Sequence, residues 1–141
     1  MSAIRQSVFP VTFKFGDSIH NMKKLSPTTH GILDYATVLF LVVSPSLFGM
    51  EPPGSYLTHA LAVVHLILTF TTDFPAGVLK IIPLRIHGLI EVTVSILLLA
   101  VAITFKILGY PVSFYFYLVF SVVLFIVWTV SDYKIAVKAA S

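Results

Sequence analysis

The chain has 141 residues, of which 57% are hydrophobic and 11% charged, and its net charge is +3. Soluble domains carry about 25% charged residues, so a water-soluble fold could not cover this much apolar surface. The absence of cysteine excludes disulfides and cysteine-ligated clusters. The basic residues flank apolar segments and form no stripe, which excludes a nucleic-acid-binding surface. The composition therefore predicts a membrane protein.

The N-terminal part, residues 1–24, contains no apolar run long enough for a signal peptide or a membrane span. Between Val8 and Phe15, apolar and polar residues nearly alternate, which is typical of extended chain. We predict a cytoplasmic N-terminal arm here, followed by a transmembrane domain over residues 25–141.

Four uncharged runs follow, at residues 35–50, 52–72, 92–105 and 107–131. A helix needs about 20 residues to cross the hydrocarbon layer, so the first and third runs must begin several residues earlier. Because the runs are continuous and do not alternate, helices are favoured over barrel strands. The predicted spans are residues 29–49, 55–73, 86–105 and 112–131.

The connections between these spans are short and rich in proline and glycine, at residues 50–54, 74–77 and 108–111. Short loops make consecutive helices antiparallel neighbours. The predicted fold is an all-α membrane protein, an up-down-up-down bundle of four transmembrane helices. Pro45 is expected to disturb the first helix, with a neighbour satisfying the carbonyl group it frees.

Lysine and arginine predict the orientation of the bundle. Lys106 alone falls on one side, and eight basic residues fall on the other: Arg5, Lys14, Lys23, Lys24, Lys80, Arg85, Lys134 and Lys138. Basic residues concentrate on the cytoplasmic side of membrane proteins. We therefore predict a multi-pass protein of the bacterial inner membrane with both termini in the cytoplasm.

One motif occurs twice, 57 positions apart. It reads His30-Gly-Ile-Leu-Asp34 at the first span and His87-Gly-Leu-Ile-Glu91 at the third. On a helix, positions i and i+4 share a face, so each copy directs an imidazole and a carboxylate the same way. Ionisable side chains within membrane spans indicate function or a buried partner.

A second motif recurs at the ends of the second and fourth spans, as Thr72-Asp73-Phe74 and Ser131-Asp132-Tyr133. Each half of the chain is thus a two-helix hairpin that enters and leaves on one side. We predict two parallel repeats, residues 25–74 and 82–133, related by an axis along the membrane normal.

These residues also carry a family resemblance. The segments are His30 to Tyr35, Ser44-Pro45 with Gly49, Thr72-Asp73-Phe74, and Ile82-Pro83 with His87 and Glu91. In this order they resemble the SPW-repeat family of bacterial integral membrane proteins, over residues 25 to 105. Ser46 stands where the family has its tryptophan. The resemblance implies a four-helix bacterial membrane protein and carries over no activity and no site residues.

The first interpretation of the histidines and acids is a polar clasp in a non-enzymatic scaffold or interaction subunit that needs no cofactor. Each carboxylate would accept a hydrogen bond from a histidine N–H, or from the hydroxyl of Thr71, Thr72 or Ser131. Such bonds would specify how the helices pack. The expected partners are the lipid bilayer, a second copy or other membrane proteins, and no nucleic acid.

The alternative is a metal- or proton-handling protein. His30, Asp34, His87 and Glu91 offer nitrogen and oxygen ligands for Zn²⁺, Mn²⁺ or Fe²⁺, with Asp73 and Asp132 as outer residues around them. Against this, bundle di-metal sites space acid and histidine by three residues and not four. His65, near mid-membrane, is a candidate for a proton or ion relay. Haem between the two histidines is disfavoured because carboxylates would face the porphyrin.

Overall fold

The structure, a computed structural model, describes residues 25–133. The predicted N-terminal arm lies outside these residues. The described part contains four long helices and two short strands: α1 (Pro27–Leu47), α2 (Gly54–Thr71), β1 (Thr72–Asp73), β2 (Ile82–Pro83), α3 (Leu84–Ile107) and α4 (Pro111–Val130).

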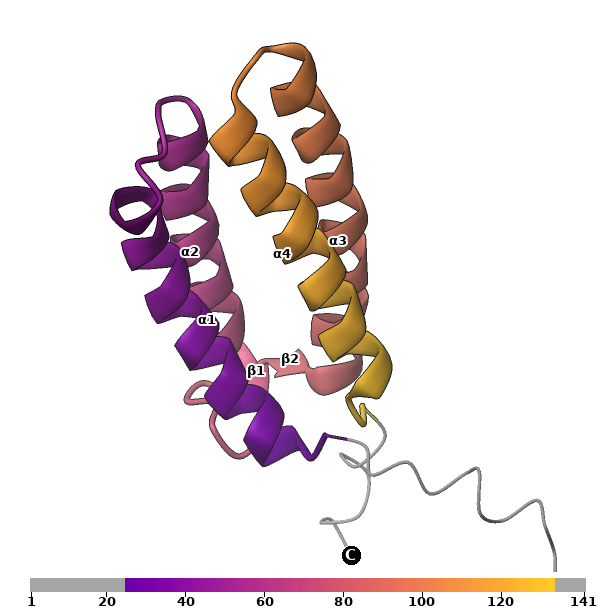
Figure 1. The fold of residues 1–141 in the computed structure, drawn as a ribbon. Coiled ribbons are helices and arrows are strands. Elements are labelled where there is room, and N and C mark those ends of the chain that lie inside the picture. Colours follow the sequence, from indigo (N-terminus) through magenta and orange to yellow (C-terminus); the bar gives the residue numbers. More distant parts are fainter. Residues whose placement is uncertain (1–24, 134–141) are drawn as a thin grey trace, which may run out of the picture.

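The helices form two antiparallel hairpins, α1–α2 and α3–α4 (Figure 1). The α1–α2 and α3–α4 loops lie at one end of the bundle. The strands, the start of α1 and the end of α4 lie at the other (Figure 1). The predicted all-α fold with four spans in up-down-up-down order is confirmed, and each helix begins and ends within about two residues of its predicted bounds.

The connection between the hairpins contains the short sheet, which the sequence analysis did not predict. β1 and β2 are parallel, with Thr72 paired to Ile82. The intervening chain folds back tightly, and a Cβ atom at Gly77 would overlap the carbonyl oxygen of Thr72. Glycine at this position therefore lets α3 start directly beside the end of α2.

The other ends of the hairpins meet in a similar way. Leu25, just before α1, forms a parallel bridge with Ser131, just after α4. The Leu25 amide donates to the Val130 carbonyl at 2.7 Å, and the Asp132 amide donates to the Leu25 carbonyl at 3.1 Å. Each hairpin thus begins beside the place where the other one ends.

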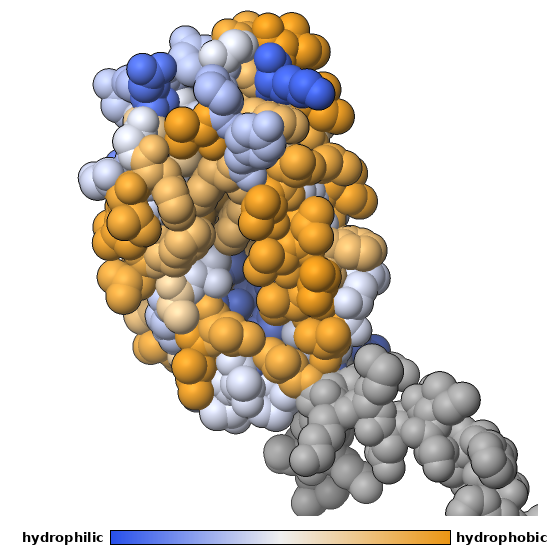
Figure 2. Space-filling model, viewed as in Figure 1, coloured by the Kyte–Doolittle hydropathy of each residue, from blue (hydrophilic) through white to orange (hydrophobic). Residues whose placement is uncertain are grey.

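The interior and the exterior of the bundle are both apolar. All four helices contribute to the buried core, which contains Leu41, Ala62, Leu98, Ala102, Phe105, Tyr117, Phe120 and Leu124. Large hydrophobic side chains are also exposed along the flanks of the helices (Figure 2). Each helix is long and apolar enough to cross a bilayer. The fold is that of a multi-pass membrane protein.

Pro45 lies inside α1 and lacks the N–H group that would bind the carbonyl of Leu41. The hydroxyl of Ser44 donates to this carbonyl at 3.2 Å. A neighbouring side chain therefore satisfies the freed carbonyl, as predicted.

Tyr117 links the two hairpins at the end opposite the strands. Its hydroxyl lies 2.6 Å from the Thr58 hydroxyl and donates to the Gly54 carbonyl at 3.0 Å, so it joins α4 to α2. The side chain is fully buried, where a hydroxyl without a partner would be costly.

We expect Tyr117→Phe to reduce the free energy of unfolding by about 0.5–1.5 kcal/mol, because it removes this bond and leaves the Gly54 carbonyl and Thr58 with fewer partners. Unfolding in mixed micelles with increasing denaturing detergent measures the change. Tyr115→Phe is the control, since Tyr115 is exposed on the same helix. Equal stability of the two variants would contradict the prediction.

Candidate metal centre

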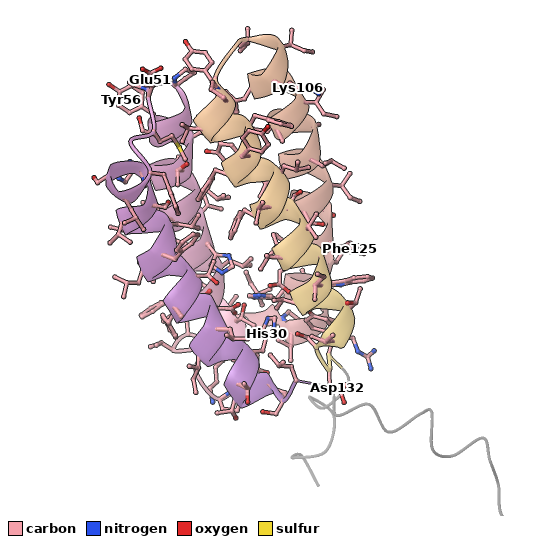
Figure 3. The ribbon with its side chains drawn as sticks, in the orientation of Figure 1. His30, Glu51, Tyr56, Lys106, Phe125 and Asp132 are labelled. Atoms are coloured by element: carbon pink, nitrogen blue, oxygen red, sulfur yellow. The ribbon has the colours of Figure 1, made fainter. Side chains whose placement is uncertain are left out.

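Four ionisable side chains meet between α1 and α3, toward the strand end of the bundle, where Figure 3 labels His30. His30 and Asp34 come from α1, and His87 and Glu91 come from α3. Each is at most 2% exposed. One potential ligand atom from each residue lies within 4.8 Å of the others. We call these four residues the centre.

The starts of the two helices place both motifs at the same depth. α1 begins at Pro27, and His30 is its fourth residue; α3 begins at Leu84, after Pro83, and His87 is its fourth residue. Proline suits the first turn of a helix because the N–H groups there have no partner within the helix. The acid follows one turn later in each case, so both pairs point into the space between the helices.

The glycine after each histidine allows an aromatic ring to close over the centre. A Cβ atom at Gly31 would overlap the ring of Phe74, and one at Gly88 would lie 2.7 Å from the ring of Tyr133. The Tyr133 ring lies edge-on to the His30 ring, with centroids 5.6 Å apart. The Phe74 ring lies edge-on to the His87 ring, with centroids 6.1 Å apart. Phe74 and Tyr133 therefore shield the centre from the end of the bundle.

The two imidazoles face each other. The Nε2 atoms of His30 and His87 are 3.4 Å apart. The other ring nitrogen, Nδ1, binds a hydroxyl of the opposite hairpin in both cases. The distances are 2.9 Å from His30 to Ser131 and 2.8 Å from His87 to Thr72.

These hydroxyls determine which ring nitrogen carries the proton. Ser131 donates its only proton to the Val127 carbonyl at 2.6 Å, and Thr72 donates its own to the Leu68 carbonyl at 2.7 Å. Each hydroxyl oxygen must then accept from the Nδ1–H group of the histidine. We therefore assign the Nδ1–H tautomer to both rings, with the Nε2 lone pairs directed at each other.

The carboxylates approach the Nε2 atoms, which carry no proton in the assigned tautomers. The Asp34 Oδ2 atom is 3.6 Å and 3.5 Å from the Nε2 atoms of His30 and His87. The Glu91 oxygens lie 3.5 Å and 3.6 Å from the same two atoms. Hydrogen bonds from N–H to oxygen measure about 2.7–3.2 Å. The Asp34 Oδ2 and Glu91 Oε1 atoms have no hydrogen-bond partner.

The spacing matches the edges of a metal coordination sphere. Two ligands bound at about 2.0–2.1 Å to one tetrahedral ion lie about 3.3–3.4 Å apart. The nitrogen–nitrogen and nitrogen–oxygen distances given above run from 3.4 to 3.6 Å. The separations within the set of four ligand atoms reach up to 4.8 Å, so the side chains would have to draw together to hold one ion. The donor set of two imidazoles and two carboxylates suits Zn²⁺, Mn²⁺ or Fe²⁺.

Tyr133 holds one of the carboxylates. Its hydroxyl donates to the Glu91 Oε2 atom at 2.6 Å. Burial raises the pKa of this hydroxyl, and the adjacent Glu91 carboxylate raises the pKa further. The phenol therefore keeps its proton and serves as a fixed donor to the Glu91 side chain.

His65, the candidate relay residue, approaches the centre from α2. Its Nε2 atom lies 3.7 Å from the Asp34 Oδ1 atom and has no hydrogen-bond partner. By contrast, Asp73 is exposed and Asp132 is half-buried, and neither belongs to the group of four. Their role as outer residues of the site stays a prediction.

The sequence analysis misassigned the hydroxyls and overlooked Tyr133. Thr72 and Ser131, which the clasp offered as alternative donors to the carboxylates, bind the imidazoles instead. A signal was present, because the recurrent hydroxyl–acid–aromatic motif contains both Thr72 and Ser131 and both covering rings. The structure turns the hydroxyl and the ring of each copy toward the centre.

Comparisons of the chain with protein-family models, curated proteins and solved structures found no match. The resemblance to the SPW-repeat family stays a prediction. The chemistry of the centre is therefore what a functional proposal can rest on.

We expect both central histidines to be Nδ1–H tautomers when the protein is kept in chelator at neutral pH, because each Nδ1 has a hydroxyl acceptor. The ¹⁵N chemical shifts of histidine-labelled protein in micelles distinguish the two tautomers. Ser131→Ala should change the His30 shifts and leave those of His87 in place. Nε2–H tautomers in the wild type would contradict the assignment.

Proposed function

We propose that this four-span membrane protein binds one divalent transition-metal ion at the centre. The observation that carries the proposal is the approach of the two Nε2 atoms to 3.4 Å, beside two carboxylate oxygens, Asp34 Oδ2 and Glu91 Oε1, that have no hydrogen-bond partner. Buried acceptors that face one another repel unless a proton or a cation lies between them. The Nδ1–H tautomers leave no ring proton for that purpose, so a cation is the better match.

The donor geometry favours this proposal over the clasp. A clasp needs imidazole N–H groups or hydroxyls that point at the carboxylates, but in the assigned tautomers both N–H groups bind the hydroxyls of Thr72 and Ser131. Ligand histidines in metal sites commonly donate the second ring N–H group in this way, which fixes the ring for the ion. Thr72 and Ser131 are thus orienting groups for the two histidine ligands.

Charge balance favours a divalent ion. The centre contains two carboxylates and two neutral imidazoles, and the Tyr133 phenol is neutral. A divalent cation makes the whole site neutral, which reduces the cost of placing charges inside a membrane protein. Four protein ligands on one ion leave no open position of the kind that catalytic zinc sites keep. We therefore propose that the protein holds or transfers the ion and does not act as a hydrolase.

Two parallel repeats are supported by matching contacts. The bond from His30 to Ser131 corresponds to the bond from His87 to Thr72. The packing of Phe74 on Gly31 corresponds to that of Tyr133 on Gly88. Such pairs are what a two-fold axis along the bundle would produce. We propose that the two hairpins are copies of one unit and that the metal ion lies near this axis.

The charge distribution supports a bacterial inner membrane with the centre near its cytoplasmic face. Within the described residues, Lys80 and Arg85 lie next to β2, at the strand end. Lys106, labelled in Figure 3, lies at the opposite end. Basic residues favour the cytoplasmic side. An ion at the centre would then exchange with the cytoplasm.

We expect the purified protein to bind one Zn²⁺, Mn²⁺ or Fe²⁺ ion per chain, and a chelator to lower its midpoint of thermal unfolding. Asp34→Asn and Glu91→Gln each remove an anionic ligand. Each should weaken binding by more than the about 10–100-fold typical of groups that only orient ligands. Titration calorimetry and elemental analysis measure these effects.

Glu51→Gln is the control, because it removes an exposed acid from the opposite end of the bundle and should bind metal normally. A wild type that contains no metal, binds none of the three ions and does not respond to chelator would refute the metal proposal. The centre would then have only a structural role.

For the orientation, a reporter that is active only in the cytoplasm should work when fused after Ser141. The same reporter inserted at Pro53, in the α1–α2 loop, should be inactive. The reverse result would place the centre at the outer face of the membrane.

A further inference from the structure

His65 is a buried polar side chain that the proposed centre does not use. It lies on α2, outside the group of four ligands. Its Nε2 atom has no hydrogen-bond partner, and Ser95, a buried hydroxyl on α3, does not provide one. The Ser95 hydroxyl donates instead to the Val92 carbonyl at 2.8 Å. An unpaired imidazole nitrogen in this environment is costly unless it binds something.

The Asp34 carboxylate lies between His65 and the centre. Its Oδ2 atom faces the two central imidazoles at 3.5 and 3.6 Å. Its Oδ1 atom faces the Nε2 atom of His65 at 3.7 Å. A carboxylate can bind a metal ion through either oxygen, so Asp34 offers one ligand to the centre and one to a second position beside it.

Exposure indicates which of these positions is nearer the outside. His65 remains 9% exposed, whereas the four ligands are at most 2% exposed. Hydrophilic atoms are visible at the floor of a hollow between the hairpins (Figure 2). Phe74 and Tyr133 cover the four ligands from the end of the bundle, so of the five side chains His65 is the one that reaches the surface, although its Nε2 atom is buried.

We propose that His65 Nε2 and Asp34 Oδ1 form an outer metal position through which the ion reaches and leaves the centre. This inference rests on the proposed metal-binding function and adds a route to it. Ligands exchange one at a time, so Asp34 stays bound while His65 is replaced by the central imidazoles. No bond other than metal–ligand bonds is made or broken.

Charge limits the site to one ion. The two carboxylates balance a single divalent cation, and a second one at the outer position would leave two uncompensated charges within the bundle. The outer position is therefore occupied only while an ion moves to or from the centre. This predicts a stoichiometry of one in the wild type and in variants of His65.

The test compares the kinetics of metal binding in wild type, His65→Leu and His65→Gln. Stopped-flow mixing of the detergent-solubilised chain with Zn²⁺ and a fluorescent zinc indicator gives the association rate. Mixing the loaded protein with excess chelator gives the dissociation rate. His59→Gln is the matched control, because His59 lies on the same helix, is exposed, and binds the Ser55 carbonyl through Nδ1 at 2.9 Å.

We expect each His65 variant to bind one ion with a Kd within about threefold of wild type. Both rates should fall by about tenfold or more, because the intermediate position has lost a ligand. The control should match wild type in both rates. Two different replacements guard against one variant that fails to fold.

Unchanged rates in a folded His65 variant would overturn the outer position and leave the centre intact. A faster dissociation rate with a correspondingly weaker Kd would also overturn it, since His65 would then only orient Asp34. A wild type that binds no metal would refute the proposed function itself, before any His65 variant is compared.

Discussion

The two hydrogen bonds from the central imidazoles to hydroxyls of the opposite hairpin are the interaction on which the rest of the structure depends. Each bond fixes the rotation and the tautomer of a histidine, and each also crosses from one hairpin to the other. Without these bonds, the two Nε2 atoms would not be held facing each other beside the buried carboxylates. The site and the joint between the hairpins are therefore the same set of contacts.

Such a joint is needed because lipid provides little hydrophobic drive for helices to associate. The hairpins are joined at one end by the strand pairs and the imidazole–hydroxyl bonds, and at the other by Tyr117. Between these ends, the core is apolar and close in character to its surroundings. A metal ion that draws ligands from α1 and α3 would add a third link, and ion binding would be coupled to the docking of the hairpins.

The sequence was sufficient to predict the fold and the meeting of the two His/acid motifs. Continuous apolar runs define the helices, and the i, i+4 spacing places each acid on the face of its histidine. It could not predict the tautomers, because these depend on the backbone just after α2 and α4. Thr72 and Ser131 are both extended there, at ψ 140° and 146°. This conformation brings the hydroxyl of each motif to an imidazole, and propensity does not reveal it. His65 was singled out, but its proximity to Asp34 depends on tertiary packing.

The two rings over the centre, Phe74 and Tyr133, differ by one hydroxyl group, and this makes the two halves of the chain unequal at the centre. Phe74 has no hydroxyl, so it covers the centre without holding an acid, whereas Tyr133 tethers Glu91. The acid without a tether, Asp34, is the one that faces His65. A hybrid gene that encoded residues 82–133 twice would tether both acids and lack His65. One that encoded residues 25–74 twice would leave both acids untethered with an imidazole on each side. Only the chain with two different halves places a tethered acid opposite an untethered one.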